Sequence, residues 1–359
     1  MLKVCKFGGS SLADAEGFLR VKTIVENDPA RRVIVVSACG RRHEHDRKVT
    51  DLLYLCHAQL AYGASCFDAF EKVRRRYLQI RDELHLTCSP EREFQALYQS
   101  LSPETPADLL ASRGEYFAAR LMAELLGFEF VDAADWLFFD EDGSVKKEES
   151  YKKLRQLAQG KSVVIPGFYG TAPDGSIRTF SRGGSDVTGA LAAAALNCDV
   201  YENWTDVDGV LMADPHIVAN AASVPGLSYA QLKLLSDMGT QVMHRCAIEP
   251  VWEKQIPMQI KNTFFPNHAG SVVGEKTDPN RKIVAFCTQV RETGGTLAVL
   301  YNGQTIPETV WMIAQSLQIT GISAQDGCVF FQMDAAKTNE ALKRAYTLAE
   351  NEIFLHKNT

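Results

Sequence analysis

The sequence predicts an α/β protein with a mainly parallel sheet, plus a small C-terminal α+β module. Residues 2–7, 13–26 and 32–38 read in turn as strand, helix and strand, which is the opening of an α/β unit. Residues 33–36 (VIVV) form a continuous apolar run, typical of a strand that is covered on both faces, as in a parallel sheet. At roughly 150 residues per domain, the 359 residues suggest about two domains.

Strand-like and helix-like segments continue along the chain. Two glycines, Gly8 and Gly9, end the first strand, and the charged loop 40–48 precedes a helix for which Thr50 is the expected N-cap. Mostly helical sequence runs on to about residue 126, with breaks at Ser89-Pro90 and Ser102-Pro103. The other expected elements are strands at 128–132, 162–168, 199–204 and 257–263, and helices at 185–197, 228–238 and 246–254.

A change of composition marks a candidate domain boundary. Residues 265–281 carry two prolines, two glycines and many polar residues. Beyond this segment, the expected elements form a βαββα pattern: strand 296–301, helix 307–317, strands 319–323 and 328–333, and helix 335–350. We therefore expect one domain over residues 1–275 and a small module over residues 283–359.

Composition and charge exclude several classes of protein. Hydrophobic residues make up 46% of the chain and charged residues 23%, which excludes disorder and coiled coil. The 38 basic and 44 acidic side chains give a net charge of −6, which argues against a nucleic-acid partner, and the run Arg74–Arg76 is expected to be a solvated helix face. No apolar run approaches the roughly 18 residues that span a bilayer, so we expect no membrane partner.

The cysteines and the N-terminus bear on the compartment. The nine cysteines are scattered without a CxxC pair, which predicts buried reduced thiols rather than a zinc or redox motif. The first six residues run straight into glycines and contain no apolar signal core. These features predict a cytoplasmic enzyme or sensor.

The first chemical motif is the segment Lys6-Phe7-Gly8-Gly9-Ser10-Ser11, at the end of the first strand. Glycines let the backbone approach a ligand closely and a lysine adds positive charge, so the segment suits phosphates. It is not a P-loop, because the lysine precedes the glycines and the GxxxxGK[ST] spacing is absent. The alternative is a Gly-Gly turn that serves only the chain topology.

A second glycine pair directly precedes the alanine-rich helix. Arg182 offers a bidentate guanidinium for a carboxylate, and Gly183-Gly184 again permits close approach. Ser185 or Asp186 could cap the helix, and an ordinary cap is the alternative reading of Asp186. The cap does not explain why the arginine, the glycines and the acid stand together.

Two further segments combine acids with turn residues. Residues 205–209 (TDVDG), continued by Asp214-Pro215, form either a strand-end turn or a loop that holds a nucleotide at the carboxyl edge of a sheet. Gly114 lies inside a helical segment, where a glycine costs roughly 1 kcal/mol, and this indicates close approach of another group, such as a substrate. Glu115 alone reads as an ordinary surface acid.

The sequence gives little support for a metal site or for two classes of hydrolase. The loop segment His43-Glu44-His45-Asp46 has ligand-type side chains, but no further ligands lie at telling spacing, so a solvated loop is favoured. Neither GxSxG nor HExxH occurs, which leaves a serine hydrolase or a zinc peptidase unsupported.

Taken in order, these motifs resemble those of the aspartokinases, within the amino-acid kinase superfamily. The matching segments are KFGGSS at 6–11, VVSA at 35–38, VTDLL at 49–53, GE at 114–115, SRGGSD at 181–186 and TDVDG at 205–209. The resemblance covers about residues 1–275. It implies a three-layer sandwich of the amino-acid-kinase type, an ACT-like C-terminal module, and transfer of the γ-phosphoryl group of ATP to the side-chain carboxylate of L-aspartate.

The resemblance also implies roles for single residues. The implied groups are Lys6, Gly8, Gly9 and Ser10 at the phosphates; Lys6 and Asp186 as the catalytic pair; Glu115 at the substrate ammonium; Arg182 at a substrate carboxylate; Thr50 and Ser185 as hydrogen-bond donors; and Thr205, Asp206, Leu211 and His216 at the nucleotide. Magnesium would enter with ATP, since the sequence identifies no dedicated metal ligand.

The chain departs from the family at the nucleotide side and in its tail. Leu211, His216 and Gln241 stand where many members have an aromatic residue, an arginine and a lysine. Regulated members carry two ACT domains, whereas residues 283–359 have room for one. An isolated module exposes a sheet edge, so we expect a homodimer through it, and an amino-acid effector is left open.

Two other functions are alternatives to an aspartokinase. Another amino-acid kinase, such as an acetylglutamate- or glutamate-kinase-like member, would share the fold, but Arg182 together with Glu115 favours a free α-amino acid. A non-catalytic amino-acid sensor is motivated by the altered nucleotide residues and opposed by the retained Lys6, Arg182 and Asp186.

Overall fold

The computed structural model describes residues 1–181, 183–240, 243, 245–274, 281–292, 294–319 and 321–355. The chain forms two compact units. The first comprises Met1–Asp206 and Glu249–Asn267, and the second comprises Val207–Ile248 and His268–Thr359. The division into domains at residues 1–275 and 283–359 stays a prediction.

The first unit is built around a parallel sheet. Its strands hydrogen-bond in the order β3-β4-β2-β1-β7-β9, and every neighbouring pair is parallel. The strands are β1 (Lys3–Phe7), β2 (Arg31–Val36), β3 (Glu129–Phe130), β4 (Val163–Pro166), β7 (Val200–Thr205) and β9 (Met258–Asn262). The parallel sheet predicted from the apolar run at 33–36 is confirmed, and all four of these residues are buried.

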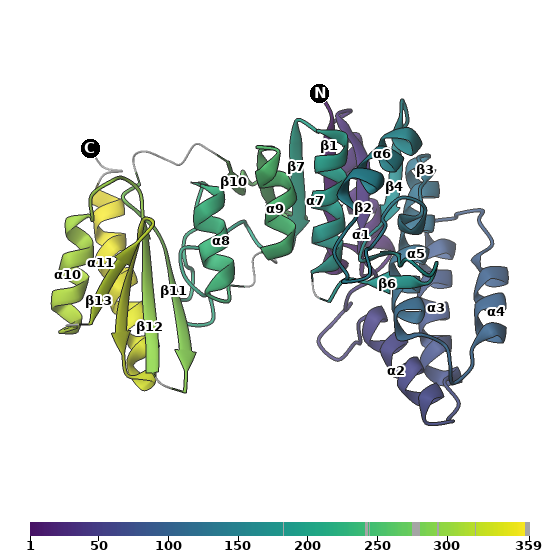
Figure 1. Ribbon diagram of the computed structural model, residues 1–359, viewed down its shortest axis with the longest axis horizontal. Coiled ribbons are helices and arrows are strands. Elements are labelled where there is room, and N and C mark those ends of the chain that lie inside the picture. The colour runs from purple at the N-terminus through teal and green to yellow at the C-terminus, as the bar shows by residue number, and fades with distance from the viewer. Residues whose placement is uncertain are drawn as a thin grey trace. The chain divides into compact units, whose positions relative to one another are not determined.

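Helices cover both faces of this sheet (Figure 1). Cys5, Phe7, Ile34 and Val36 join one hydrophobic core with side chains of five helices. These helices are α1 (Ala15–Glu26), α2 (Val49–Ala61), α3 (Phe67–Glu83), α4 (Pro90–Ser100) and α5 (Ala107–Leu126). On the other face, α7 (Gly184–Leu196) packs on β1 and β7, and α6 (Lys147–Ala158) packs on α7. The result is the expected layering of helices, sheet and helices.

Close packing fixes α7 on the sheet. Ala192 to Ala195 are buried, so short side chains bring the helix axis near the strands. A Cβ atom added at Gly189 would lie 2.5 Å from Tyr201 Oη and 3.1 Å from Lys6 Cβ, closer than real side chains come. The first turn of α7 is therefore held beside the end of β1.

Several short elements were not predicted or were predicted differently. The hairpin of β5 (Tyr169–Thr171) and β6 (Ile177–Thr179) and the helix α6 were not predicted; the short helices η1 (Gly9–Leu12) and η2 (Ala133–Asp135) are further turns of this unit. The expected N-cap at Thr50 is wrong: α2 starts at Val49 after Lys48, whose side chain makes no cap bond. Helix α9 (Arg245–Glu253) leads into β9.

The second unit contains a parallel strand pair and an α+β module. The pair is β8 (Gly226–Leu227) with β10 (Ser271–Val273), and α8 (Tyr229–Asp237) begins with a capping box of Ser228 and Gln231. The module has an antiparallel sheet in the order β11-β12-β14-β13. Its elements are β11 (Ile283–Arg291), β12 (Gly294–Tyr301), α10 (Glu308–Leu317), β13 (Ile322–Gln325), β14 (Cys328–Met333), η3 (Ala335–Lys337) and α11 (Thr338–Leu355). Because β11 precedes β12, the order is ββαββα rather than the expected βαββα.

Two expectations about single side chains need correction. Arg74 and Arg75 pair with Glu71 at the surface of α3, but Arg76 is only 5% exposed, so the solvated basic face is wrong for this arginine. All nine cysteines are free, and most are buried as predicted, whereas Cys246 is exposed. Among the described residues, no helix is long and apolar enough to cross a bilayer.

Candidate active site

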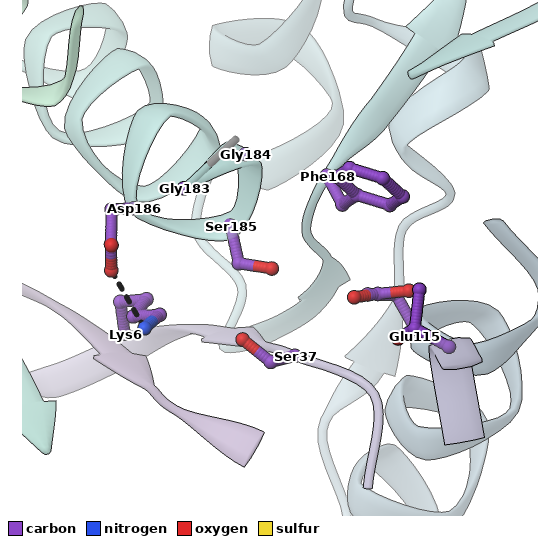
Figure 2. Close-up of a pocket in the computed structure, with 9 residues that line it drawn as sticks. Lys6, Ser37, Glu115, Phe168, Gly183, Gly184, Ser185 and Asp186 are labelled. Atoms are coloured by element: carbon purple, nitrogen blue, oxygen red, sulfur yellow. Dashed lines mark ion pairs between the residues drawn. The ribbon is translucent and has the colours of Figure 1, made fainter. Parts of the chain in front are cut away.

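A cavity of about 260 Å³ opens in the first unit (Figure 2). It is lined by residues from the ends of three strands, from α2 and α5, and from the first turn of α7. These residues are Lys6, Ser37, Thr50, Glu115, Phe168, Gly183, Gly184, Ser185 and Asp186. The carboxyl ends of parallel strands meet at one edge of a sheet, which is where such folds bind ligands.

Lys6 and Asp186 form an ion pair at one wall of the cavity (Figure 2). The Lys6 Nζ atom lies 2.6 Å from Asp186 Oδ1, and the two side chains are 9% and 19% exposed. Lys6 comes from the end of β1 and Asp186 from the first turn of α7. An ammonium group at this place can hold an anionic ligand, and the carboxylate fixes its direction in the absence of ligand.

The first turn of α7 depends on glycines. Gly183 is the N-cap residue, with φ of +60°, and no side chain caps the helix, so the expected caps at Ser185 and Asp186 are wrong. A Cβ atom at Gly184 would lie 2.5 Å from Phe168 Cδ2. The cavity thus meets the N-terminus of a 13-residue helix, whose free N–H groups favour anions. Arg182 and Gln241 lie outside the described residues.

Glu115 is a buried acid rather than a surface one. Its side chain faces the cavity from α5 and is 4% exposed, and its Oε2 atom has no hydrogen-bond partner among the described residues. Burial raises the pKa of the Glu115 carboxyl from 4.5 to about 8, although hydrogen bonds from backbone and the charge of Lys6 act against this shift. A cationic group entering the cavity would find an uncompensated acceptor here.

Gly114 serves the packing beside Glu115. A Cβ atom at this position would lie 2.7 Å from Ala38 Cβ and 3.3 Å from Val49 Cγ1. The group that approaches this glycine is therefore the chain after β2, not a substrate. The Gly114 carbonyl oxygen accepts a hydrogen bond of 2.6 Å from the hydroxyl of Tyr77. This bond holds α5 in place next to Glu115.

The glycine-rich segment after β1 adjoins Lys6. The Gly8 N–H donates to the Trp204 carbonyl oxygen at 3.1 Å, and a Cβ atom at Gly8 would lie 3.6 Å from Lys6 Nζ and 4.0 Å from Ser10 Oγ. Gly9 leaves no room for a side chain, since its Cβ atom would lie 2.8 Å from the Ala38 carbonyl oxygen. The three residues Gly8, Gly9 and Ser10 lie beside the cavity but do not line it.

The expected nucleotide residues fall in two places. Thr205 ends β7, next to the end of β1, and its hydroxyl donates to Asp206 Oδ1 at 3.2 Å. Neither residue lines the cavity. Leu211 and His216 belong to the second unit, so their part in nucleotide binding stays a prediction.

Two lining residues, Ser37 and Phe168, are not among the expected site residues, although Ser37 lies within the VVSA motif at 35–38. Ser37 directly follows the buried strand β2, so the rule about strand ends could have found it. Phe168 has a φ of +79°, which is rare for a side chain of this size, and its N–H donates to Thr188 Oγ1 at 3.0 Å. No sequence signal marks such a strained residue, and strain of this kind gathers at functional sites.

No group of three or more His, Cys, Asp and Glu side chains that could hold a metal is found in the part of the chain that the structure describes. In the loop at 43–46, Asp46 is bound by arginine side chains and is neither a metal ligand nor solvated as expected. Chemically, the cavity combines an ammonium group, helix N–H groups and a buried carboxylate, which together suit an anion beside a ligand that carries its own ammonium group.

Comparisons with known proteins agree with this chemistry. The model of the amino acid kinase family matches residues 1–262. Aspartokinase 3 of Bacillus subtilis is 38% identical over 303 residues, which cover 80% of this chain and 67% of that protein. The curated relatives are longer: this chain spans 64% of lysine-sensitive aspartokinase 3 of Escherichia coli, at 29% identity over 77% of the chain.

Solved structures give the same result for the fold. The aspartate kinase of Clostridium acetobutylicum superimposes with a TM-score of 0.87 at 29% identity, over 97% of this chain and 99% of that one. E. coli aspartokinase III in complex with aspartate and ADP has a TM-score of 0.72 at 23% identity, over 94% of this chain and 80% of that one.

Proposed function

Since the chain belongs to the amino acid kinase family, among the aspartokinases, we propose that it transfers the γ-phosphoryl group of ATP to the side-chain carboxylate of L-aspartate. The product is 4-phospho-L-aspartate. The observation that carries the proposal is the Lys6–Asp186 ion pair at the start of α7, in the same cavity as the buried Glu115.

We assign the residues to the two substrates as follows. Lys6, Gly8, Gly9 and Ser10 face the phosphates, and Asp186 orients Lys6. Glu115 binds the α-ammonium group of aspartate, Arg182 pairs with a carboxylate, and Thr50 and Ser185 donate hydrogen bonds. Thr205, Asp206, Leu211 and His216 are the residues that we assign to the nucleotide. The ion pair of Lys6 with Asp186 and the burial of Glu115 support this assignment.

The reaction asks little covalent chemistry of the protein. The attacking carboxylate is ionised at neutral pH, so no general base is needed. What the site supplies is alignment of the carboxylate with the γ-phosphorus and positive charge where the equatorial oxygens gather negative charge. Lys6 and the N–H groups of α7 are the groups placed to do this.

Magnesium fits this site as a companion of the nucleotide. Its ligands in proteins are oxygen atoms, and it is usually held by one or two carboxylates plus substrate phosphates. Two acidic side chains line the cavity, and since Glu115 is assigned to the substrate ammonium, Asp186 is the one that would contact the metal. Magnesium bound to the ATP phosphates would neutralise part of their charge; this chain's own residues orient and hold the two substrates.

The proposal predicts a substrate preference. Aspartate should support ADP release. Glutamate should support it about 10- to 100-fold less because of its additional methylene group, and N-acetylglutamate at least about 100-fold less because it leaves the buried Glu115 unpaired. An N-acetylated substrate has no ammonium group for Glu115. A coupled ADP-release assay with the three substrates side by side measures this. Equal activity with N-acetylglutamate would contradict the assignment of Glu115, and no activity with any of them would favour the amino-acid sensor.

The pKa of Glu115 predicts how aspartate binding depends on pH. With a pKa of about 8 in the free protein, the carboxyl is mostly protonated at pH 6 and must lose its proton to bind an ammonium group. The dissociation constant for aspartate should therefore fall about tenfold per pH unit between pH 6 and pH 7, and level off above pH 8. Titration calorimetry in two buffers of different ionisation enthalpy should show about one proton released on binding at pH 6.5.

Glu115→Gln provides the control for this pH dependence. Glutamine keeps the shape of the side chain and does not titrate, so the pH dependence between 6 and 8 should disappear and aspartate should bind more weakly. A pH dependence that survives in this variant would assign the proton to another group. Because burial raises the pKa of Glu115, ionised Glu115 destabilises the folded chain, and Glu115→Gln should also raise the unfolding temperature at pH 9.

We further propose that the chain is a homodimer formed through its C-terminal module, which an amino acid can bind as an effector. Strand β13 is the edge of the module's sheet, and its four residues are exposed. An uncovered edge of this kind favours pairing with a second strand. Sedimentation of the full chain, with and without lysine or threonine, tests both statements.

A further inference from the structure

Arg76 of α3 is a buried arginine that binds three residues outside its own helix. Its Nη2 atom donates to both carboxylate oxygens of Asp46, at 2.9 and 2.7 Å. Its Nη1 atom donates to the carbonyl oxygen of Gly40 at 3.1 Å and to that of Ala13 at 3.4 Å. The side chain is 5% exposed and does not line the cavity.

Two of these residues, Ala13 and Gly40, lie beside the glycine-rich turn. Ala13 directly follows the short helix η1, which begins at Gly9. Gly40 follows β2, and its N–H donates to the Gly9 carbonyl oxygen at 2.8 Å. Gly40 has no room for a side chain, because its Cβ atom would lie 2.6 Å from the carbonyl carbon of Gly9. The guanidinium group of Arg76 therefore holds both the backbone at Ala13, which follows the turn, and the backbone at Gly40, which packs against it.

The third residue, Asp46, keeps the guanidinium group in place. Asp46 also accepts hydrogen bonds from the backbone N–H and from Nε of Arg42, both at 3.0 Å. Burial opposes ionisation of Asp46, but the hydrogen bonds from Arg42 and the charge of Arg76 outweigh it and hold the pKa of this carboxyl well below its usual range. The loop 40–48 is thus closed by a carboxylate that stays ionised at neutral pH.

We infer that Arg76 and Asp46 are positioning residues for phosphoryl transfer, which hold the Gly8–Gly9 turn at the place where it faces the nucleotide phosphates. This inference rests on the proposed function, because that function assigns the turn to the phosphates. The two residues act through Gly40 and Ala13 and touch no substrate.

Neighbours on α3 show that this role is specific to Arg76. Arg75 is exposed and pairs with Glu71 on its own helix. Tyr77 is buried like Arg76, but its hydroxyl donates to the Gly114 carbonyl oxygen of α5, not to the glycine-rich turn. Arg75→Met and Tyr77→Phe are therefore matched controls, the first for loss of an arginine from α3 and the second for loss of a buried hydrogen bond.

The experiment compares these controls with Arg76→Lys, Asp46→Asn and the double variant Arg76→Met/Asp46→Leu. The double variant leaves no unpaired buried charge, so it keeps the test valid where a single variant fails to fold. Circular dichroism checks the fold. Calorimetry with a non-hydrolysable ATP analogue and magnesium, and separately with aspartate, measures binding to the full chain. Limited trypsin digestion, read by mass spectrometry, reports on the exposed basic residues Arg41, Arg42, Arg47 and Lys48.

In the variants of Arg76 and Asp46 we expect the ATP analogue to bind about tenfold or more weakly, since small displacements of positioning groups cost that much. Aspartate affinity should change by less than about twofold, and trypsin should cut within residues 41–48 several times faster. In Tyr77→Phe the affinity for the ATP analogue should be unchanged, and in Arg75→Met both affinities and the cutting rate should be. This selectivity is a result that general destabilisation does not produce.

Three results would overturn the inference. Unchanged binding of the ATP analogue in the folded double variant would show that Arg76 and Asp46 have no part in positioning the Gly8–Gly9 turn. Equal losses for aspartate and the ATP analogue would assign Arg76 a merely structural role. If the unaltered chain itself binds no nucleotide, the proposed function fails and this inference fails with it. Faster trypsin cutting in the variants of Arg76 and Asp46 alone would then still show that Arg76 holds the loop 40–48.

Discussion

Replacing Lys6 by alanine is expected to lower the rate of aspartate phosphorylation by at least about 10²–10³-fold, the loss seen when one preorganised group that stabilises developing charge is removed. The Lys6 ammonium group lies at the cavity wall, where Asp186 holds it 2.6 Å away. Aspartate binding should remain nearly unchanged, since Glu115 supplies the contact to the substrate ammonium. Turnover assays with saturating aspartate and calorimetry with aspartate measure the two effects.

Two further variants decide how Lys6 acts. Lys22→Ala removes a partly exposed lysine of α1 that pairs with Glu26, and it should leave turnover unaltered. Asp186→Asn keeps the shape of the partner but removes its charge, so the ammonium group is less firmly directed and turnover should fall less than in Lys6→Ala. Undiminished turnover in Lys6→Ala would remove Lys6 from the mechanism.

Much of the first unit could be predicted because its buried strands and helices carry strong apolar patterns. Residues 33–36 form a strand buried on both faces, and Phe18, Val21, Ile24 and Val25 of α1 are buried as their spacing predicts. Helix α6 is highly charged, but its buried Tyr151, Leu154 and Ala158 stand at helical spacing, so this helix could have been predicted from its pattern. Strands β5 and β6 have three residues each, too few for a pattern. Strand β11 directly follows the polar segment 265–281, which predicts a domain boundary.

The site could be predicted in part for a similar reason. Lys6 and Asp186 stand next to glycine pairs at the ends of elements, and these signals are local in the sequence. Contacts between distant segments have no such signal: the spacing of Val73 and Ile80 places Arg76 on the buried side of α3, but nothing in the sequence identifies Asp46, 30 positions away, as its partner. The buried state of Glu115 likewise depends on Gly114 packing against Ala38.

Glu202 of β7 is the most densely bonded buried acid of the first unit among the described residues. It is 0% exposed. It accepts hydrogen bonds from Lys3 Nζ at 2.9 Å, from Arg31 Nε at 2.8 Å, and from the indole N–H of Trp204 at 2.9 Å. The Trp204 ring stacks on Phe7, and its carbonyl oxygen accepts the Gly8 N–H. This network lies on the opposite face of β1 and β7 from Lys6 and ties the starts of three strands together.

Replacing Glu202 by leucine is expected to lower the free energy of unfolding at pH 7 by about 3–5 kcal/mol, because Arg31 would remain largely buried without its counter-charge, while Lys3 keeps only its ion pair with Asp28. Urea denaturation followed by circular dichroism measures the loss. Glu129→Leu is the control: Glu129 pairs with Lys161 at the surface, where both side chains are about half exposed, and its loss should change the free energy by less than about 1 kcal/mol. A similar small change for Glu202→Leu would show that the network adds nothing net to stability.

The pH dependence of this loss follows from the ionisation of Glu202. Burial by itself would raise its pKa, but the hydrogen bonds and charges of Arg31 and Lys3 outweigh burial, and the pKa of the folded chain lies below the usual 4.5. A lowered pKa means that the stabilisation is fully present above the usual value and is lost as the pH falls through the carboxyl range. The difference in stability between the unaltered chain and Glu202→Leu should therefore be constant from pH 8 to pH 6 and shrink below about pH 4.5. A difference that grows on acidification would mean that the buried carboxyl is protonated in the folded chain, and the ionic description of the network would be wrong.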